Sequence, residues 1–359
     1  MILHDDFHTI KLLNYYLTTP NYKRFFVILQ FRKPVMTTLE DIQETITDEL
    51  ELLHGKITGS LMSSNLLMNQ VIDGYLRTKG KLIRPILVIL TAKLFGSVND
   101  KVIASAAAVE MLHNASLIHD DVVDDTKTRR NRPTINSVWD NHIAVLVGDF
   151  FVSSSLQQAI STGDIRIVDS LACLGRLLSL GEIDQIYSAR YHNLDEKAYF
   201  EIINRKTASL FVSCVKMGAY AVGVEDDRID SISRFAELLG LCFQIKDDIF
   251  DYYEDKTIGK PTGNDLREGK ITLPLLYALQ QSGHPDSGRM AALSRKESLN
   301  SQEISTLIEF AKEAGGIDYS YATMQRLRNE AIGIISQFPQ SETTRAFADI
   351  FDYIIVRDR

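Results

Sequence analysis

The sequence is poor in cysteine, and the few cysteines that it has do not suggest disulfides or a metal site. Its 359 residues include three cysteines, each in an apolar stretch without a neighbour at metal-ligand spacing. Free cysteine is often buried, and disulfides are rare where thiols are kept reduced. We therefore expect Cys173, Cys214 and Cys242 to be buried small apolar side chains in a reducing compartment.

Long apolar runs and an excess of positive charge are also missing. We find no signal peptide and no apolar run of the length that a membrane span needs, so we expect a cytoplasmic protein without a transmembrane segment. The formal net charge is −8, which argues against binding to nucleic acid. An anionic ligand would need locally clustered cations or bound metal ions.

Proline is scarce, and strand patterns are nearly absent. None of the eight prolines lies between Pro133 and Pro261, and because proline breaks helix interiors this gap leaves room for long helices. Apolar residues recur at helical spacing in 102–125, 143–160, 165–189, 196–222 and 229–253, with turn-rich joints at 95–100, 129–134, 259–264 and 282–287. The pattern predicts an all-α protein whose single large domain, residues 36–359, surrounds a central cavity.

Residues 1–35 differ from the rest of the chain. They are basic and contain a short aromatic and aliphatic run from Phe25 to Phe31. Such a segment could anchor a protein to a membrane surface. We expect instead a dispensable N-terminal extension, either disordered or upstream of the true start at Met36.

Two acidic clusters end apolar helical segments. HNASLIHDDVVDD spans 113–125 and FQIKDDIFD spans 243–251, and each carries aspartates at i, i+1 and i+4: Asp120, Asp121 and Asp124, and Asp247, Asp248 and Asp251. Like charges one turn apart destabilise a helix, and burying them unpaired costs more. Mg²⁺ takes a few carboxylates and completes its shell with water and phosphate oxygens. One cluster could be a solvated helix end, but two on apolar helices predict a magnesium–diphosphate site.

Basic residues that could meet a diphosphate lie near the turn-rich joints. Phosphate recognition uses charged hydrogen-bond donors, and the candidates are Lys81, Arg84, Arg129, Arg130, Lys206, Lys260 and Lys270. Lys206 stands out because it lies inside the apolar stretch RKTASLFVSCV, where a lysine usually needs a partner.

The motifs GKLIRP, HNASLIHDDVVDD, RRNRPT, VGDFF, KTASLF, FQIKDDIFD and GKPTGNDLREGKITLPLL occur in that order. In this the chain resembles the polyprenyl synthetase family, which includes farnesyl, geranylgeranyl, octaprenyl and solanesyl diphosphate synthases, from about Met36 to the C-terminus. The resemblance implies an isoprenoid synthase-like fold, a homodimer and a Mg²⁺-dependent prenyltransferase that condenses isopentenyl diphosphate with an allylic diphosphate. Asn131 stands where the family usually has glycine, and Asp125 replaces a usual glutamate; neither departure removes a ligand.

The resemblance also implies a role for each matched residue. The six aspartates would hold three Mg²⁺ ions on the allylic diphosphate. Isopentenyl diphosphate would bind Lys81, Arg84, His113 and Arg130. The allylic side would use Arg129, Lys206, Thr207, Gln244, Lys260 and Lys270, with the dipoles of Thr207 and Gln244 stabilising the allylic cation. His119 is expected to be structural, and Gly148–Phe150 to be a packing motif.

Small residues precede the first cluster and bear on product length. The prenyl tail should run back along the first helix, where one turn rises about 5.4 Å, close to the length of an extended isoprene unit. Short-chain members of the family tend to have bulky aromatics there, whereas this chain has Ala115 and Ser116. We therefore expect a medium- or long-chain all-trans product, longer than geranylgeranyl diphosphate. The floor of the tunnel could be Leu112, Met111 or a residue of a neighbouring helix.

Two other functions fit parts of the pattern. A class I terpene cyclase also uses an aspartate-rich helix, but it normally lacks the isopentenyl site and a second Asp-Asp-x-x-Asp cluster. A non-catalytic partner subunit would shape a heteromer, but such subunits in this family lose their aspartates, and this chain keeps all six.

Overall fold

The fold is almost entirely helical, as the sequence predicts. The computed structural model describes residues 38–77, 80–129, 131–253, 262–280 and 284–357. The predicted extension 1–35, Arg130 and Lys260 lie outside this range. Within it, the one sheet is a short antiparallel pair, β1 (Thr128–Arg129) and β2 (Arg132–Pro133), in which Thr128 faces Pro133 and Arg129 faces Arg132.

The helices follow one another along the chain with short connections. Their bounds are α3 Leu39–Glu44, α4 Thr47–Leu61, α5 Leu66–Leu76, α6 Ile83–Phe95, α7 Asp100–Val123, α8 Ile135–Val138, α9 Asn141–Ser161, α10 Ile165–Arg190, α11 Glu196–Ile203, η1 Asn204–Ala208, α12 Ser209–Ala221, η2 Asp226–Arg228, α13 Asp230–Phe250, α14 Asn264–Arg267, α15 Leu273–Gln280, α16 Ser287–Ser294, α17 Ser301–Glu313, α18 Gly316–Ile335 and α19 Glu342–Val356.

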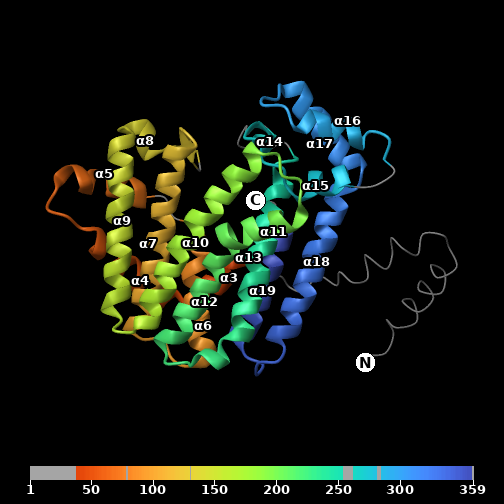
Figure 1. Ribbon diagram of the computed structural model, residues 1–359. Coiled ribbons are helices and arrows are strands. Elements are labelled where there is room, and N and C mark those ends of the chain that lie inside the picture. Colours follow the sequence, from red (N-terminus) through yellow and green to blue (C-terminus); the bar gives the residue numbers. More distant parts are fainter. Residues whose placement is uncertain (1–37, 78–79, 130, 254–261, 281–283, 358–359) are drawn as a thin grey trace, which may run out of the picture.

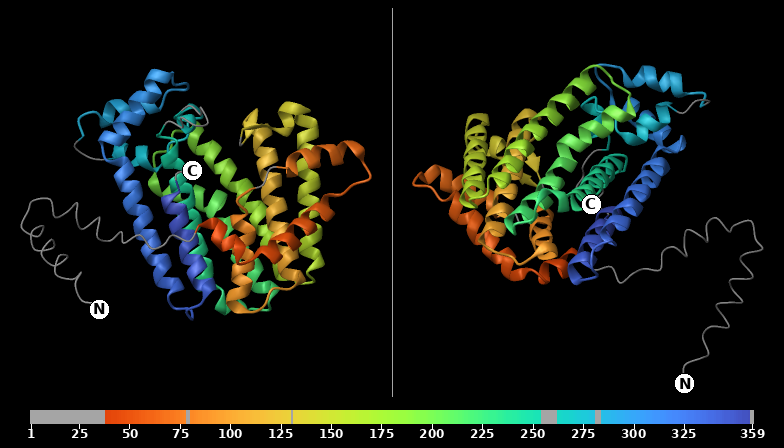
Figure 2. Two further views of the ribbon diagram at one scale, coloured as in Figure 1. Left: turned by 180° about the vertical axis from the view of Figure 1, so that it is seen from behind. Right: turned by 60° about the horizontal axis from the view of Figure 1, so that its bottom comes forward.

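The long helices stand side by side around α7 and α13 (Figure 1). The helix α7 packs along α9 and also contacts α6 and α12, whereas α13 packs against α12, α18 and α19. Figure 2 shows the same bundle from behind and from below, with α16 and α17 gathered at one end. Aromatic side chains fill the core around α13, where the Phe235 ring meets the rings of Phe347 and Phe351 edge-on at 5.5 and 5.7 Å.

Both acidic clusters stand at the C-terminal ends of their helices. The side chain of Asn99 caps the start of α7, which is buried over most of its length and ends at Val123. The helix α13 ends at Phe250. The C-terminal end of a helix carries partial negative charge and disfavours carboxylates. Aspartates crowded at such an end favour a nearby cation.

A π-helical turn interrupts the segment that was predicted as one helix over 196–222. The chain passes from α11 through η1 into α12, and such turns are rare and often lie at functional sites. Gly181 of α10 allows the close approach to this turn, because a Cβ there would lie 2.7 Å from the backbone nitrogen of Lys206.

Two expectations from the sequence need correction. Cys214 and Cys242 are buried, but Cys173 is exposed, because Leu171 and Leu174 turn toward the core and leave Cys173 on the outer side of α10. No apolar run long enough for a membrane span was expected, yet α9 is long and apolar enough to cross a membrane by length and composition. This is weak evidence, since core helices pass the same test, and α9 packs along α7.

Candidate active site

The first acidic cluster is held in place by the hairpin that follows it. Asp121 is buried. Its Oδ1 accepts a hydrogen bond from Nε of Arg129 at 2.8 Å and forms an ion pair with Nη2 of the same side chain at 2.8 Å. Asn136 donates to the Asp121 backbone carbonyl at 3.0 Å. Arg129 is therefore fixed beside the cluster, where it was expected.

Burial and neighbouring carboxylates raise the pKa values of two aspartates in the first cluster. The pKa of Asp120 is raised to about 6, chiefly by burial and further by Glu182 and Asp124, against the opposing charges of Lys206 and Arg129. Burial also raises the pKa of Asp124, which Lys270 opposes. Lys206 and Lys270 thus act on this cluster although they come from distant parts of the chain.

Lys206 has the partners that a lysine in an apolar stretch needs. Its ammonium group forms an ion pair with Glu182 and donates to Gln185 Oε1 at 2.7 Å. These two residues of α10 were not predicted from the sequence. A single Glu and a single Gln on a helix carry no signal of their own, and only the close packing at Gly181 brings them to Lys206.

In the second cluster, Asp247 is paired with an arginine near the C-terminus. Arg357 donates through Nη2 to Asp247 Oδ1 at 2.6 Å and to the Phe243 carbonyl at 3.1 Å. Its guanidinium lies 4.1 Å from the centroid of the Phe243 ring. Burial raises the pKa of Asp247, against the opposing charges of Arg357, Arg84 and Lys81. Arg357 was not predicted from the sequence.

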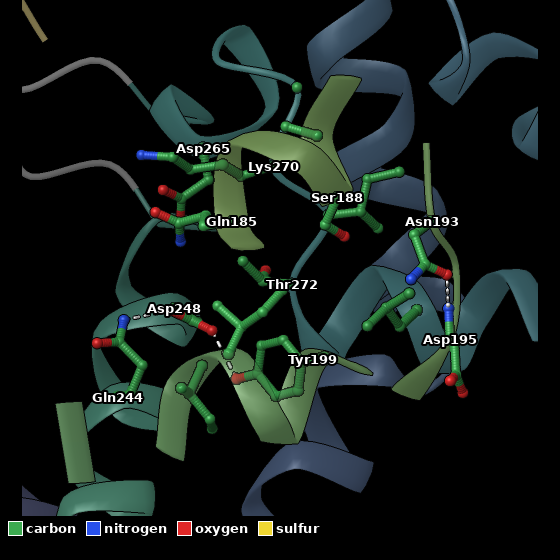
Figure 3. A pocket seen from close by; sticks show the side chains of 16 residues that line it. Gln185, Ser188, Asn193, Asp195, Tyr199, Gln244, Asp248, Asp265, Lys270 and Thr272 are labelled. Carbon is green, nitrogen blue, oxygen red and sulfur yellow. Dashed lines mark hydrogen bonds between the residues drawn. The ribbon is translucent and has the colours of Figure 1, made fainter. Parts of the chain in front are cut away.

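Asp248 is buried and held through both of its oxygens (Figure 3). Oδ2 accepts from the Tyr199 hydroxyl at 2.6 Å, and Oδ1 accepts from Gln244 Nε2 at 2.8 Å. Thr207 donates to Gln244 Oε1 at 2.7 Å, so these two residues, both expected on the allylic side, contact each other. Burial and the neighbouring Asp265 raise the pKa of Asp248 to about 8, although the two hydrogen bonds oppose this.

Asp251 binds the backbone at the start of α14. Its carboxylate accepts from the amides of Asn264 and Asp265, each at 3.0 Å. This contact anchors the segment that carries Lys270, which forms a 2.5 Å ion pair with Glu268. Asp251 therefore stabilises the local fold, in addition to any contact that it makes with a metal.

The residues expected to bind isopentenyl diphosphate lie at the start of α6 and along α7. Lys81 is exposed, with its Nζ 5.4 Å from the Tyr353 ring centroid, and Arg84 is half-buried. His113 is buried on α7. Because Lys81 and Arg84 both lower the pKa of Asp247, these cations lie on the side of the second cluster.

Two residues with expected packing roles lie next to the first cluster. The His119 Nε2 atom lies 3.3 Å from the Val145 carbonyl oxygen and 3.5 Å from Asp149 Oδ1. A Cβ on Gly148 would come within 2.2 Å of His119 Nε2, so this glycine makes room for the ring.

The acidic residues suit a cation that is shared with a ligand. Among the described residues, no three His, Cys, Asp or Glu side chains meet as a ready metal site. Mg²⁺ binds through one or two carboxylates and takes its other ligands from water and phosphate. The raised pKa values of Asp120 and Asp248 show carboxylates that a nearby cation would relieve. The donors therefore fit Mg²⁺ bound together with a diphosphate.

Two hollows bear on the site: a cavity that includes Asp248 of the second cluster, and an apolar groove that reaches Leu112 of α7, eight residues before Asp120. A cavity of about 60 Å³ lies between α10, α11 and α13 and is lined by Gln185, Tyr199, Gln244, Asp248 and Lys270 among others (Figure 3). A larger groove of about 570 Å³ lies between α7, α9 and α10 and is mostly apolar, with Leu112, Ser155, Gly175 and Ser179 in its wall.

Comparisons with known proteins show the family to which the chain belongs. The model of the polyprenyl synthetase family matches residues 65–311. The chain is 32% identical to heptaprenyl diphosphate synthase component 2 of Geobacillus stearothermophilus, over 89% of this chain and 99% of the relative. A decaprenyl diphosphate synthase from Rhodobacter capsulatus has a similar structure, with a TM-score of 0.82 and 28% identity over 90% of this chain and 100% of that one.

A second solved structure is of interest for its ligands. The polyprenyl synthase of Caulobacter crescentus CB15, complexed with calcium and isoprenyl diphosphate, has a TM-score of 0.82 and is 30% identical over 90% of this chain and 98% of that one. These matches cover nearly the whole bundle and both acidic helix ends. The chain therefore belongs to the polyprenyl synthetase family of prenyltransferases.

Proposed function

We propose that this enzyme is a Mg²⁺-dependent prenyltransferase that condenses isopentenyl diphosphate with an allylic diphosphate and makes a medium- or long-chain all-trans polyprenyl diphosphate. The observation that carries the proposal is the pair of acidic helix ends, with Lys206 and Lys270 acting on one and Arg84 and Lys81 on the other. Incubation of the purified protein with farnesyl diphosphate, isopentenyl diphosphate and MgCl₂ tests it.

Two groups of basic residues bind the two diphosphate substrates. Arg129, Lys206 and Lys270 bind the allylic diphosphate next to the acidic clusters, and Lys81 and Arg84 orient isopentenyl diphosphate. Three Mg²⁺ ions, when bound, supply positive charge that makes the allylic diphosphate a better leaving group. The allylic carbon–oxygen bond breaks, the double bond of isopentenyl diphosphate forms the new carbon–carbon bond, and the released diphosphate takes the proton. Thr207 and Gln244 hold their dipoles near the allylic carbon.

Arg84 offers a test of the isopentenyl side. Loss of a charged hydrogen-bond donor to a phosphate removes about 1.5–3 kcal/mol, so Arg84→Ala should raise the KM for isopentenyl diphosphate by about 10- to 100-fold and leave the KM for farnesyl diphosphate nearly unchanged. Lys93→Ala on the same helix is the control, since Lys93 pairs with Glu49 at 2.7 Å. Steady-state kinetics with each substrate varied would contradict this role if both KM values rose together.

We also propose a cytoplasmic homodimer. The outer sides of α9 and α10 expose Val145, Leu146, Leu156, Ile160, Leu177, Leu180, Ile183 and Ile186, and α9 lies at the edge of the bundle (Figure 1). A patch of this kind marks an interaction surface, and a second copy is its commonest occupant.

Light scattering in solution tests the dimer. The wild-type protein should have twice the 40.5 kDa mass of one chain, and the double variant Leu146→Glu with Ile183→Glu should have the mass of a single chain. Leu66→Glu on α5, also apolar and exposed, is the control and should remain dimeric. A wild-type mass of one chain would refute the proposal.

A further inference from the structure

Tyr199 is a buried residue that has no role in the sequence motifs or in the proposed reaction. It lies on α11 and is 7% exposed, and its ring meets Phe200 edge-on at 5.4 Å. A buried tyrosine hydroxyl needs a hydrogen-bond partner. Here the partner is Asp248 Oδ2 at 2.6 Å, a carboxylate of the second acidic cluster (Figure 3).

The hydrogen bonds orient the Asp248 carboxylate without saturating it. Tyr199 binds one oxygen and Gln244 the other, and Asp248 is only 5% exposed, so water has little part in setting its direction. A carboxylate oxygen can accept more than one hydrogen bond. Each oxygen of Asp248 therefore keeps capacity for a further ligand while its plane is fixed.

The same contacts connect two parts of the site. Tyr199 and Lys206 belong to one continuous helical run, α11 followed by η1, whereas Asp248 belongs to α13. The Tyr199–Asp248 bond and the Thr207–Gln244 bond tie this run to α13 at two points. The orientation of the Asp248 carboxylate is thus coupled to the position of η1, the π-helical turn that carries Lys206.

We propose that Tyr199 is a positioning residue that acts through Asp248, by holding this carboxylate in the direction in which it supports binding of a divalent cation with diphosphate. This inference rests on the proposed function of the same site. Residues that orient metal-binding side chains in this way typically change metal affinity by about 10- to 100-fold when they are replaced.

Tyr199→Phe tests the inference because it removes one oxygen and keeps the ring in the core. The matched control is Tyr252→Phe: Tyr252 is also buried, but its hydroxyl lies 3.3 Å from Thr272 Oγ1 and does not bind Asp248. Calorimetric titration of MgCl₂ into protein with inorganic diphosphate should show at least 10-fold weaker binding for Tyr199→Phe and unchanged binding for Tyr252→Phe. The KM for isopentenyl diphosphate should not change in either variant.

A double-mutant cycle tests whether the effect of Tyr199 depends on Asp248. If Tyr199 acts through Asp248, the double variant Tyr199→Phe with Asp248→Ala should bind Mg²⁺ and diphosphate as weakly as Asp248→Ala alone. Additive losses, or equal behaviour of Tyr199→Phe and Tyr252→Phe, would overturn the inference. Failure of the proposed function looks different, since the wild-type protein would then bind Mg²⁺ and diphosphate but form no elongated product.

Discussion

Replacing Asp120 by alanine is expected to lower the rate of prenyl transfer by about 10³-fold, the size of effect seen when a main electrostatic group of an active site is lost. Asp120 lies at the negative end of α7, and burial raises the pKa of its carboxyl to about 6. Burial and the negative helix end both disfavour a charged carboxylate at this position. We infer that Asp120 helps to bind a cation, which would offset both effects. Asp247→Ala should have an effect of similar size.

The stability of the Asp120→Ala variant separates a lost site from a lost fold. Removal of a carboxylate from a crowded helix C-terminus relieves repulsion among like charges, so the melting temperature without Mg²⁺ should be equal to or above that of the wild-type protein. Asp125→Asn is the control, because the exposed Asp125 side chain at the same helix end pairs with Lys127, and asparagine tolerates the positive φ of 49° at this position. Turnover by Asp120→Ala and Asp247→Ala at the wild-type rate would refute the role of both clusters.

Ser116→Phe is expected to shorten the product by several isoprene units. Leu112, Ser116 and Asp120 follow one another at intervals of four and so lie along one side of α7, with Leu112 about 12 Å from Asp120 along the helix axis. Leu112 lines the apolar groove between α7, α9 and α10. A prenyl tail that starts at Asp120 would pass Ser116 and reach this groove.

Ala115, the other residue expected to control length, is fully buried. Ala115→Phe should also shorten the product, but it adds a ring to the packed core and is expected to cost about 1–3 kcal/mol of stability. Ser116 is half-buried and gives the cleaner variant.

Gly175→Leu narrows the same groove from the opposite helix. Gly175 lines the groove, and a Cβ there meets nothing within 4 Å, so the variant should fold and give shorter products. Gly333→Leu on α18, where a Cβ is equally free of contacts, is the control and should leave the products unchanged. Chromatography of dephosphorylated products measures their length. Wild-type lengths from both Ser116→Phe and Gly175→Leu would show that the tail takes another route.

Features that repeat in the sequence could be predicted well. The long helices follow from regular apolar spacing and the lack of proline, and the two aspartate clusters from a spacing that occurs twice. The π-helical turn at Lys206 could not be predicted, because an apolar helix with one extra residue in a turn keeps nearly the same pattern. It arises where α10 approaches closely at Gly181.

Partners that meet only through folding were missed. Glu182, Tyr199 and Arg357 are single polar residues on ordinary helices or at a helix end. Each contacts a site residue that lies at least 24 residues away in the sequence, on another segment. The double engagement of Asp251 by the start of α14 was missed for the same reason. The candidate metal-binding residues could thus be predicted from their clustering in the sequence. The side chains that position them could be identified only in the structure.

The most direct test of the central claim is chain elongation by the purified protein alone. With farnesyl diphosphate, radiolabelled isopentenyl diphosphate and MgCl₂, the account predicts labelled all-trans polyprenyl diphosphates longer than geranylgeranyl diphosphate, and no product when EDTA is added. Absence of label from every prenyl product in the presence of Mg²⁺, or conversion of the allylic substrate alone into a cyclic hydrocarbon, would contradict it.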